Sequence, residues 1–389
     1  MRILHWYPNF LGGGATANAV LALARAQARL GFKVSIVTAE ALKTPLYGSM
    51  QERLSADVEL IRWTPFWTLK KGVFVLRGLP LQARRTLIDW RPDIVHIHGE
   101  FNADNLRVPA LFQCPLVLSP HGSFAPEVFT KSRQGLKKTY FKIATRLLYR
   151  HVKAFHALCP MEASHINQLL PGVRAYRVPE GPNFRPEQSL PLETGSPPRK
   201  TVSFLFIGRL DIFTKGLDVL LEAFAEARRS LTELPPISLT LVGPDWQGGM
   251  QHLRRQAQAL GIAEHVFFTG SLPPDEVKTT LAKADIYIQL SRHEVFSLSV
   301  AEALLSRKPA ILSKNVGAVS WPELASLPHV RVVDFAAEET ALAMADFACR
   351  LVALRSAAER YQAKVSDFLS WDRAAHLHVK AYRTLCSSC

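Results

Sequence analysis

The segment IYIQLSRHEVFSLSVAEALLSRKPAIL, residues 286–312, decides the fold class because it reads as one complete strand–helix–strand unit. Apolar runs at 286–290 and 310–312 flank a helical pattern of apolar residues at 298–306. Short apolar strands that are joined through a helix form parallel sheets. Ser297 directly precedes the helical pattern and is the expected N-cap. The segment therefore predicts an α/β fold in which a polar loop leads from a strand into a helix.

The same alternation continues on both sides of a stretch rich in Pro, Gly and Ser at residues 190–200, which reads as a linker. We therefore expect two doubly wound, Rossmann-like domains, one at 1–189 and one at 201–370. A last helix within 371–389 is expected to pack back on the first domain. Open parallel sheets bind ligands beyond the carboxyl ends of their strands, so two such domains can face one central cleft.

The elements of the first domain are expected as strands at 2–7, 33–38, 58–63, 93–98, 116–119, 154–158 and 176–179, and as helices at 15–30, 102–112, 136–151 and 161–170. In the second domain we expect strands at 202–207, 238–242, 266–269, 286–290 and 310–312, and helices at 217–230, 250–260, 275–282 and 298–306. Further helices are expected at 337–354, 357–369 and 373–385.

The composition narrows the class of protein. The 389 residues carry a formal net charge of +14, which favours anionic partners such as phosphorylated ligands, membrane surfaces or nucleic acid. We expect no membrane span, no secretory signal and a cytoplasmic location. Five cysteines do not make a disulfide framework in a chain of this length. The pair Cys386 and Cys389 would need a second ligand pair, or a strand-to-helix context, to act as a metal or redox site.

Three consecutive glycines, Gly12, Gly13 and Gly14, follow the first expected strand and precede a helix. Glycine lets the backbone approach a ligand closely, and free N–H groups at a helix start attract phosphate. The stretch does not match GxGxxG, so a dinucleotide site is poorly supported. A tight turn without a ligand is the alternative that the residues leave open.

A second loop, GRLDIFTKG at residues 208–216, directly follows the first strand of the second domain. Arg209 offers a planar fork for phosphate oxygens, and Lys215 offers a mobile positive charge. Either cation alone is more often plain surface charge. Both cations at one strand end favour an anion site.

Two carboxylates accompany the helix expected at 298–306. Glu294 lies in the loop before the helix and Glu302 lies just beyond its first turn. Free N–H groups at the helix start favour an anion, yet two carboxylates would repel a diphosphate. They are explained if they face hydroxyls, one on a sugar ring and one on a ribose. The alternative is two solvated carboxylates, but together with the cations they indicate a pocket for a nucleotide diphosphate sugar.

Together these residues resemble glycosyltransferase family 4, a large family of GT-B nucleotide-sugar enzymes. The family's acid-x7-acid motif matches Glu294 and Glu302, and its Gly-Arg and Lys-Gly loop matches residues 208–216. Further landmarks are the glycines at 12–14 with GFKVSIVT at 31–38, RPDIVHIHG at 91–99, SPHGSF at 119–124 and VPEGPNF at 178–184. The resemblance covers nearly the whole chain.

The resemblance implies roles for the matching residues. Arg209 and Lys215 would clamp the donor diphosphate, Glu302 would hold the ribose, and Glu294 would bind the transferred sugar. His121 would reach the sugar from the first domain. The implied catalytic residues are Glu294, His121, Arg209 and Lys215, and the implied donor-binding residues are Gly12, Gly13, Gly14, Gly208, Arg209, Lys215, Gly243, Glu294, Phe296, Ser297, Leu298 and Glu302. No metal and no cofactor is expected.

Three stretches of the sequence depart from the family pattern. Val295 and Ser297 replace two glycines of a usual E-G-F-G, and valine resists positive φ, so a cradle of slightly different shape is expected. Residues 306–308 stand where a glycine before proline is common. Glu180-Gly181 replaces a frequent Asn-Gly pair.

Residues 131–153 contain eight Lys and Arg residues and no acid. This pattern predicts a basic amphipathic helix that docks on an anionic inner leaflet through Lys138, Lys142, Arg146 and Arg150. An interfacial edge of Trp63, Phe66, Trp67, Lys70 and Lys71 would add to it. A solvated helix face over an ordinary core stripe is the alternative.

The main hypothesis is a retaining transferase that moves a hexose-type sugar from a UDP- or GDP-sugar to an envelope polysaccharide or a lipid-linked glycan. Retention is implied by the resemblance alone. A nucleotide-sugar epimerase on the same fold is the alternative enzyme. A basic nucleic-acid-binding protein would leave the two Glu residues unexplained, and RGG repeats, zinc knuckles and an RNP-like motif are missing. No nucleic-acid partner is therefore expected.

Overall fold

The computed structural model describes residues 1–40, 57–71, 74–130, 134–182, 201–230 and 235–387. The chain forms two compact units, which are Met1–Asn183 with Ser370–Cys389 and, between them, Phe184–Leu369. The linker expected at 190–200 lies outside the described residues. None of the described helices is long and apolar enough to cross a membrane.

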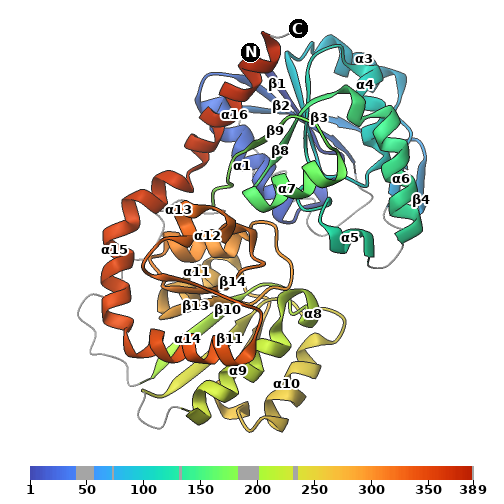
Figure 1. Cartoon of the computed structure of the whole chain (residues 1–389). Coiled ribbons are helices and arrows are strands. Elements are labelled where there is room, and N and C mark those ends of the chain that lie inside the picture. The colour runs from blue at the N-terminus through green and yellow to red at the C-terminus, as the bar shows by residue number, and fades with distance from the viewer. Residues whose placement is uncertain (41–56, 72–73, 131–133, 183–200, 231–234, 388–389) are drawn as a thin grey trace. The chain divides into compact units, whose positions relative to one another are not determined.

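The first unit is built on a parallel sheet, of which Figure 1 labels β1, β2, β3, β8 and β9. The strand order is β3-β2-β1-β6-β7-β8-β9. Its strands are β1 (Arg2–Trp6), β2 (Lys33–Ala39), β3 (Val58–Trp63), β6 (Ile94–His98), β7 (Leu116–Ser119), β8 (Val152–Ala157) and β9 (Ala175–Arg177). A separate antiparallel hairpin is formed by β4 (Thr68–Lys71) and β5 (Phe74–Arg77). Every residue of β6 and β7 is buried, as expected for strands that are covered on both faces.

The helices of this unit are α1 (Ala15–Arg29), α3 (Leu81–Asp89), α4 (Val108–Leu111), α5 (Pro126–Thr130), α6 (Gln134–Leu147), α7 (Pro160–Leu169) and α16 (Trp371–Cys386), with the short turns η1 (Phe10–Gly12), η2 (Ala103–Arg107) and η3 (Tyr149–His151). Although α16 comes from the far end of the chain, it packs on α1. Val379 and Tyr382 of α16 share a core cluster with Val20 and Leu21 of α1. The last helix therefore belongs to the first unit.

The second unit has a six-stranded parallel sheet in the order β12-β11-β10-β13-β14-β15. Its strands are β10 (Val202–Ile207), β11 (Ile237–Val242), β12 (Val266–Gly270), β13 (Ile286–Gln289), β14 (Ala310–Ser313) and β15 (Val330–Val333). Its helices are α8 (Ile212–Lys215), α9 (Leu217–Ser230), α10 (Gly249–Ala259), α11 (Pro274–Lys283), α12 (Leu298–Leu305), α13 (Pro322–Ala325), α14 (Ala337–Cys349) and α15 (Leu351–Phe368), with the turns η5 (Ala263–His265) and η6 (Gly317–Ser320).

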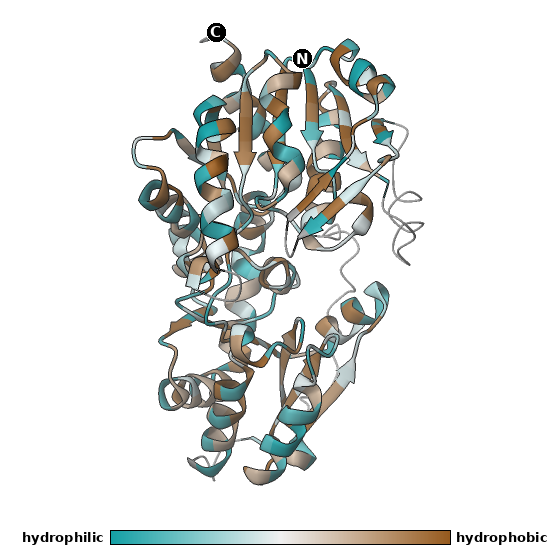
Figure 2. Ribbon diagram, turned by 90° about the vertical axis from the view of Figure 1, so that its right-hand side faces the viewer, coloured by the Kyte–Doolittle hydropathy of each residue, from teal (hydrophilic) through white to brown (hydrophobic). Residues whose placement is uncertain are grey.

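The hydropathy of the chain follows this layered arrangement. Figure 2 shows mostly hydrophobic colours on the strands, whereas the helices carry both hydrophobic and hydrophilic residues. The core of the second unit includes Phe204 of β10, Leu239 of β11 and Phe224 of α9, all fully buried. An apolar sheet that is sandwiched between two-sided helices is what the strand–helix alternation predicts.

The predicted α/β class and the two doubly wound sheets are confirmed. The hairpin β4–β5, helix α3 and strand β15 were not predicted. Of the described residues of α3, Leu87 alone is buried, so this helix carries almost no apolar pattern. The continuous helix predicted at 102–112 is wrong, because the chain forms a 3₁₀ turn and then a single helical turn there. The break predicted after residue 354 lies instead at Arg350.

Candidate active site

The strand order of the second unit reverses between β10 and β13, which are neighbours in the middle of the sheet. Chain segments that leave two such strands diverge to opposite sides, and this leaves a crevice at their carboxyl ends. The loop at 208–216 follows β10, and the loop that carries Glu294 follows β13. The topology therefore brings together the two segments that the sequence indicated.

The loop after β10 ends in the single-turn helix α8. Asp211 caps this helix, because its carboxylate accepts the backbone N–H of Thr214 at 3.0 Å. Gly216 ends it in the left-handed region with φ of 64°. A Cβ atom at this position would lie 2.0 Å from the carbonyl oxygen of Leu290, the residue after β13. Only glycine therefore lets α8, and with it Lys215, pack against the end of β13.

Close packing also explains why residue 243 is a glycine. Its Cβ would lie 1.9 Å from the carbonyl oxygen of Gly208, and the N–H of Gly208 donates to the carbonyl of Val242 at 2.9 Å. The loops after β10 and β11 thus touch backbone to backbone. The role in donor binding that was predicted for Gly208 and Gly243 stays a prediction.

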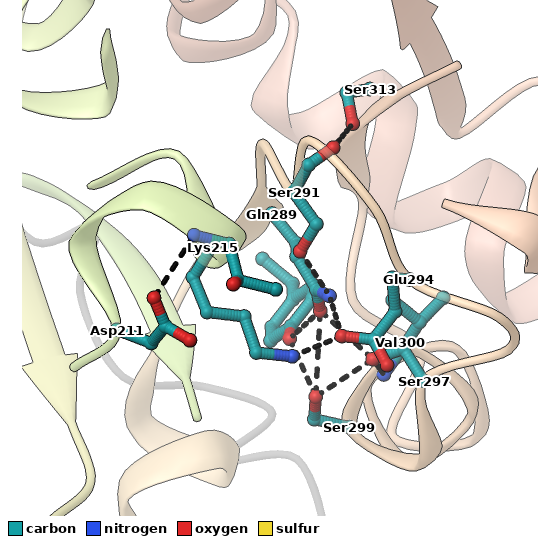
Figure 3. A network of polar contacts seen from close by, with 11 residues as sticks. Asp211, Lys215, Gln289, Ser291, Glu294, Ser297, Ser299, Val300 and Ser313 are labelled. Atoms are coloured by element: carbon teal, nitrogen blue, oxygen red, sulfur yellow. Dashed lines mark hydrogen bonds and ion pairs between the residues drawn. The ribbon is translucent and has the colours of Figure 1, made fainter. Parts of the chain in front are cut away.

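Lys215 and Glu294 form an ion pair at the switch point, as Figure 3 shows. Their side chains are 15% and 21% exposed, so the pair is accessible from solvent. The amide nitrogen of Gln289 donates to the same carboxylate at 3.4 Å. Gln289, the last residue of β13, was not predicted as part of the site, because a single glutamine in an apolar strand gives no signal in the sequence.

Ser297 caps α12 as predicted, since its hydroxyl oxygen accepts the backbone N–H of Val300 at 3.4 Å. The same hydroxyl donates to the amide oxygen of Gln289 at 2.9 Å. The strained backbone lies at Ser297, with φ of 72°, and not at Val295, where the sequence raised the question of positive φ. The serine hydroxyl ties the loop to β13 and helps to hold this strain.

Arg292 anchors the loop after β13, and the sequence analysis did not single it out. Its guanidinium forms two hydrogen bonds with Asp218, at 2.9 and 2.7 Å. It also stacks on the rings of Phe213 and Phe335, with the guanidinium carbon 4.6 and 4.5 Å from their centroids. These contacts join the loop to α8 and α9, so the segment that carries Glu294 is held in place.

Arg209 does not join the ion pair. Its guanidinium carbon lies 4.5 Å from the ring centroid of Trp246, in the loop after β11. The Trp246 side chain is an exposed large hydrophobic group. The stacking holds the cation on an open surface, and Trp246 is a site candidate that the sequence analysis missed.

Glu302 lies on α12 and is buried, as is Phe296 in the preceding loop. Burial raises the pKa of the Tyr287 hydroxyl, and the nearby carboxylates of Glu294 and Glu302 raise this pKa further. The two acids of the motif thus lie close to one tyrosine. Leu298 is the first residue of α12, as predicted.

In the first unit, Gly12 ends η1, and Gly13 and Gly14 have φ of 72° and 90°. A Cβ on Gly14 would meet nothing within 4 Å. The left-handed backbone, and not close packing, is therefore the reason for glycine at this position. Gly14 is the N-cap of α1, which starts at Ala15 as expected.

His121 follows β7 and has two partners, and 10% of its side chain is exposed. Its Nε2 lies 3.1 Å from Nδ1 of His98, and its Nδ1 lies 3.5 Å from Oε1 of Glu180. Burial lowers the pKa of His121 to about 3 and raises that of Glu180 to about 8, with the Glu162 carboxylate adding to the second shift. Both side chains are therefore neutral at pH 7. Glu180 is the residue that replaces the frequent Asn.

Other buried histidines surround this pair. Of the described residues, His5, His96 and His98 alone are grouped closely enough to hold a metal ion. However, His5 Nδ1 and His98 Nε2 are 2.9 Å apart, and both nitrogens of His96 lie 2.6 Å from hydroxyls, those of Tyr382 and Ser119. These contacts already satisfy the nitrogens that would have to face an ion, so the cluster fits a hydrogen-bond network and not a metal centre.

The basic segment is helical over α6 only. Lys138, Lys142 and Arg146 are exposed on it, and Arg150 is exposed in η3, so the prediction of one helix from 136 to 151 is wrong at its end. Ile143 and Leu147 are also exposed, at 42% and 48%. Lys131 and Arg133 lie outside the described residues.

The aromatic edge predicted beside this helix is only partly exposed. Phe66 is 70% exposed and Trp67 is 43% exposed. Trp63 is buried and stacks on Trp6, so its predicted place in the edge is wrong.

Comparisons with known proteins match both halves of the chain. Residues 14–183 match the family described as glycosyl transferase 4-like domain, and residues 193–320 match glycosyl transferases group 1. The phosphatidyl-myo-inositol mannosyltransferase of Mycobacterium leprae is 30% identical over 236 residues, which cover 60% of this chain and 58% of the relative. The GDP-mannose:cellobiosyl-diphosphopolyprenol alpha-mannosyltransferase of Xanthomonas oryzae is 24% identical over 223 residues, 57% of this chain and 56% of the relative.

These alignments span less than two thirds of the length of either curated relative. A solved structure of Anabaena HepE in complex with UDP and glucose aligns with a TM-score of 0.72 at 16% identity. The alignment covers 99% of this chain and 100% of that one, so the two proteins share a fold.

Proposed function

This chain belongs to glycosyltransferase family 4, the group 1 glycosyl transferases with the GT-B fold, and we propose that it transfers a hexose from a nucleotide diphosphate sugar to a lipid-linked or polysaccharide acceptor. The main support for the proposal is the ion pair between Lys215 and Glu294 at the switch point of the second unit. A cation at this point suits a leaving diphosphate, and a carboxylate suits sugar hydroxyls.

In the proposed reaction the donor separates this ion pair. Lys215 turns to the diphosphate, with Arg209 as a second cation, and Glu294 accepts hydrogen bonds from the sugar. Glu302 holds the ribose, and His121 contacts the sugar from the first unit. The acceptor hydroxyl oxygen attacks the anomeric carbon while the bond to the diphosphate oxygen breaks. The acceptor's proton passes to the leaving diphosphate, and the family resemblance supports retention at that carbon.

The names of the relatives support the donor and acceptor classes. The Mycobacterium leprae and Xanthomonas oryzae proteins are named for mannosyl transfer to a phosphatidylinositol and to a diphosphopolyprenol, both of which are lipids. HepE was crystallised with UDP and glucose. A UDP- or GDP-sugar donor and a lipid-linked acceptor are therefore the first compounds to test.

The test is a transfer assay on the full chain with radiolabelled UDP-glucose, UDP-N-acetylglucosamine or GDP-mannose and a polyprenyl-diphosphate glycan or phosphatidylinositol. The proposal expects labelled lipid, and it expects none when the acceptor is omitted. A new nucleotide sugar formed without any acceptor would show an epimerase instead. The absence of both products across the panel would contradict the proposal.

A lipid acceptor would place the enzyme at an anionic membrane surface, and α6 fits this site. Its exposed Lys138, Lys142 and Arg146 provide positive charge next to exposed apolar groups. Flotation with vesicles that contain phosphatidylglycerol should carry the wild type at low salt. The triple change of these residues to Glu should abolish flotation.

The matched control replaces Arg360 and Lys364, exposed cations of α15 in the second unit, by Glu. It should leave flotation intact. Failure of the wild type to float would remove the membrane surface from the proposal, without affecting sugar transfer to a soluble acceptor.

A further inference from the structure

The first unit contains two series of linked, buried hydrogen bonds, and the direction of donation in each can be deduced. The first chain of hydrogen bonds runs through Gln27, His5, His98 and His121, and the second runs from Tyr382 through His96, Ser119 and His156 to Val178. A neutral imidazole has one N–H donor and one acceptor nitrogen, so a bond at one nitrogen fixes the role of the other. Burial lowers the pKa of His5 and His156 to about 4 and that of His96 and His98 well below its usual value. All four rings are therefore neutral at pH 7, and the rule applies to each of them.

In the second chain of hydrogen bonds, Tyr382–His96–Ser119–His156–Val178, the direction of donation is fixed at the Val178 end. Nε2 of His156 lies 3.0 Å from the carbonyl oxygen of Val178, which can only accept, so this nitrogen carries the proton. Nδ1 of His156 then accepts from the Ser119 hydroxyl at 2.6 Å, and Ser119 in turn accepts from Nε2 of His96 at 2.6 Å. Nδ1 of His96 is left to accept from the Tyr382 hydroxyl at 2.6 Å.

This direction also orients the side-chain amide of Gln27. The Tyr382 hydroxyl, which interacts with Gln27, has already given its proton to His96. Of the two ends of the Gln27 amide, Tyr382 therefore favours the nitrogen, which is buried and makes no hydrogen bond of ordinary geometry, Tyr382 included. The amide oxygen consequently faces Nε2 of His5, at 2.8 Å.

The first chain, Gln27–His5–His98–His121, then has one possible direction. Because Gln27 accepts, His5 carries its proton on Nε2, and its Nδ1 accepts from Nε2 of His98 at 2.9 Å. Nδ1 of His98 accepts from Nε2 of His121 at 3.1 Å. The bare nitrogen of His121 is therefore Nδ1, which faces Glu180 at 3.5 Å.

The backbone around His121 is held as firmly as its ring. His121 has a positive φ of 49°. The carboxylate of Glu162 on α7 accepts the N–H of Gly122 at 2.6 Å and that of Leu158 at 2.8 Å, which pins the turn to β8 and α7. A small cavity next to the ring has room for about one water molecule. Its polar lining is made by His98, Ser119, His121, His156, Glu180 and His378.

We propose that Gln27, His5 and His98 are positioning residues that fix His121 as the Nε2–H tautomer, so that its bare Nδ1 and the protonated carboxyl of Glu180 together form a seat for one hydroxyl group. Nδ1 accepts the hydrogen of this hydroxyl, and the Glu180 carboxyl donates to its oxygen. The separation of 3.5 Å between the two atoms is long for a direct hydrogen bond and too short for an oxygen to lie between them, so the hydroxyl would contact both atoms from the side of the small cavity that the two residues line. The link to a sugar hydroxyl rests on the proposed function, whereas the tautomer does not.

The test is ¹⁵N NMR of the full chain with labelled histidine, at neutral pH and without ligand, using signals assigned through single His→Asn variants. The wild type should show His121 protonated on Nε2 and bare at Nδ1. In Gln27→Met, which removes the acceptor, His5, His98 and His121 should become tautomer mixtures. His96 and His156 of the second chain should keep their Nε2 protons, which makes them a control within the same molecule.

A proton on Nδ1 of His121 in the wild type, or a charged His121, would overturn the proposal. This readout needs no substrate, so it stands or falls separately from sugar transfer. Even if Gln27→Met does not fold, the wild-type spectrum still decides which tautomer His121 adopts.

A second readout follows Glu180, which lies 3.5 Å from His121, feels the charge of Glu162 of α7, and shares the cavity with His98, His156 and His378. If transfer is detected, its rate should fall as the pH rises through about 8, because ionised Glu180 no longer donates. In Glu180→Gln, whose amide donates at every pH, this alkaline decline should vanish. If the same decline persists in that variant, Glu180 is not the donor to the hydroxyl group.

Discussion

The two units differ in the polar side chains at the switch point of each sheet, where the strand order reverses. Within β1 and β6 the first unit buries neutral imidazoles in hydrogen-bonded networks, whereas after β10 and β13 the second unit holds an ion pair whose side chains are 15% and 21% exposed. Burial makes charge costly, so the first set stays neutral and fixed in direction. The ion pair keeps part of its surface accessible to solvent, so a charged ligand can reach Lys215 and Glu294 and compete for them. The hydrogen bonds of the first unit therefore hold the imidazole rings in one orientation, whereas the ion pair of the second unit can exchange its partners for a ligand.

The largest expected effect is a loss of stability of the first unit in acid. Six of its histidines have a lowered pKa because of burial: His121, which is 10% exposed, and the buried His5, His96, His98, His156 and His378. As the pH falls from 6.5 to about 4, the unfolded chain binds protons that the folded unit does not. Each proton that only the unfolded chain binds lowers the free energy of unfolding by about 1.4 kcal/mol per pH unit.

Three carboxyls oppose this trend. Burial raises the pKa of Glu100 and Glu180 to about 8 and that of Glu162 to about 7, so their contribution to stability falls as the pH rises from 4.5. Six histidines outweigh three carboxyls below pH 6.5, and the carboxyls alone act above it. Hydrogen exchange should therefore show greatest protection of β6 and β8 near about pH 6.5. Equal acid sensitivity of β10 and β11 would break the contrast between the units.

The second-largest expected effect comes from the close packing of α8 against the end of β13, which positions Lys215 of the ion pair. Gly216→Ala would place a Cβ 2.0 Å from the Leu290 carbonyl at a positive φ, and we expect a loss of about 3 kcal/mol of unfolding free energy. Gly261→Ala is the matched control, because Gly261 also has a positive φ but has open space around it, so about 1 kcal/mol is expected. Denaturant unfolding measures both variants. Equal losses would mean that the approach of α8 to β13 is not tight.

The third effect concerns the cations of the second unit. Lys215→Ala and Arg209→Ala should each lower turnover by about a hundredfold or more, as the loss of groups that stabilise charge in the transition state does. Lys278→Ala, at an exposed pair with Asp275 in the same unit, should leave turnover unchanged. Steady-state kinetics at saturating donor is the measurement. Normal turnover in both site variants would remove these cations from the chemistry.

The smallest effect belongs to Trp246. Its ring supports the Arg209 guanidinium at an exposed site, where such stacking contributes about 0.5–1 kcal/mol. Trp246→Ala should therefore raise the KM for the donor about two- to fivefold, while Trp246→Phe should keep most of the wild-type value. A KM equal to the wild type in Trp246→Ala would show that the stacking does not position Arg209 for the donor.

The sequence predicted the sheet of each unit because buried parallel strands are short apolar runs that stand out from their surroundings. It missed elements without such a pattern, such as α3, where Leu87 is the one buried residue among those described. The helix break at Arg350 was misplaced because apolar residues continue across it, so periodicity alone does not reveal a turn.

The candidate site divides in the same way. Glu294, Lys215 and the cap at Ser297 follow from motif spacing and from strand ends, and the structure brings them together. Gln289, Arg292 and Trp246 were missed because their partners are distant in sequence and their contacts depend on three-dimensional packing. The buried histidine chains were missed for the same reason, since β1, β6, β7, β8 and α16 must first assemble.

The most direct test of the account is calorimetric titration of UDP and GDP into the full-length wild type and into Lys215→Ala. The account predicts that one of the two nucleotides binds the wild type at one site and binds Lys215→Ala at least tenfold more weakly, with Lys278→Ala unchanged. Equal affinity of the wild type and Lys215→Ala, or no binding of either nucleotide to the wild type, would contradict the claim that the ion pair after β10 and β13 opens to take a nucleotide diphosphate.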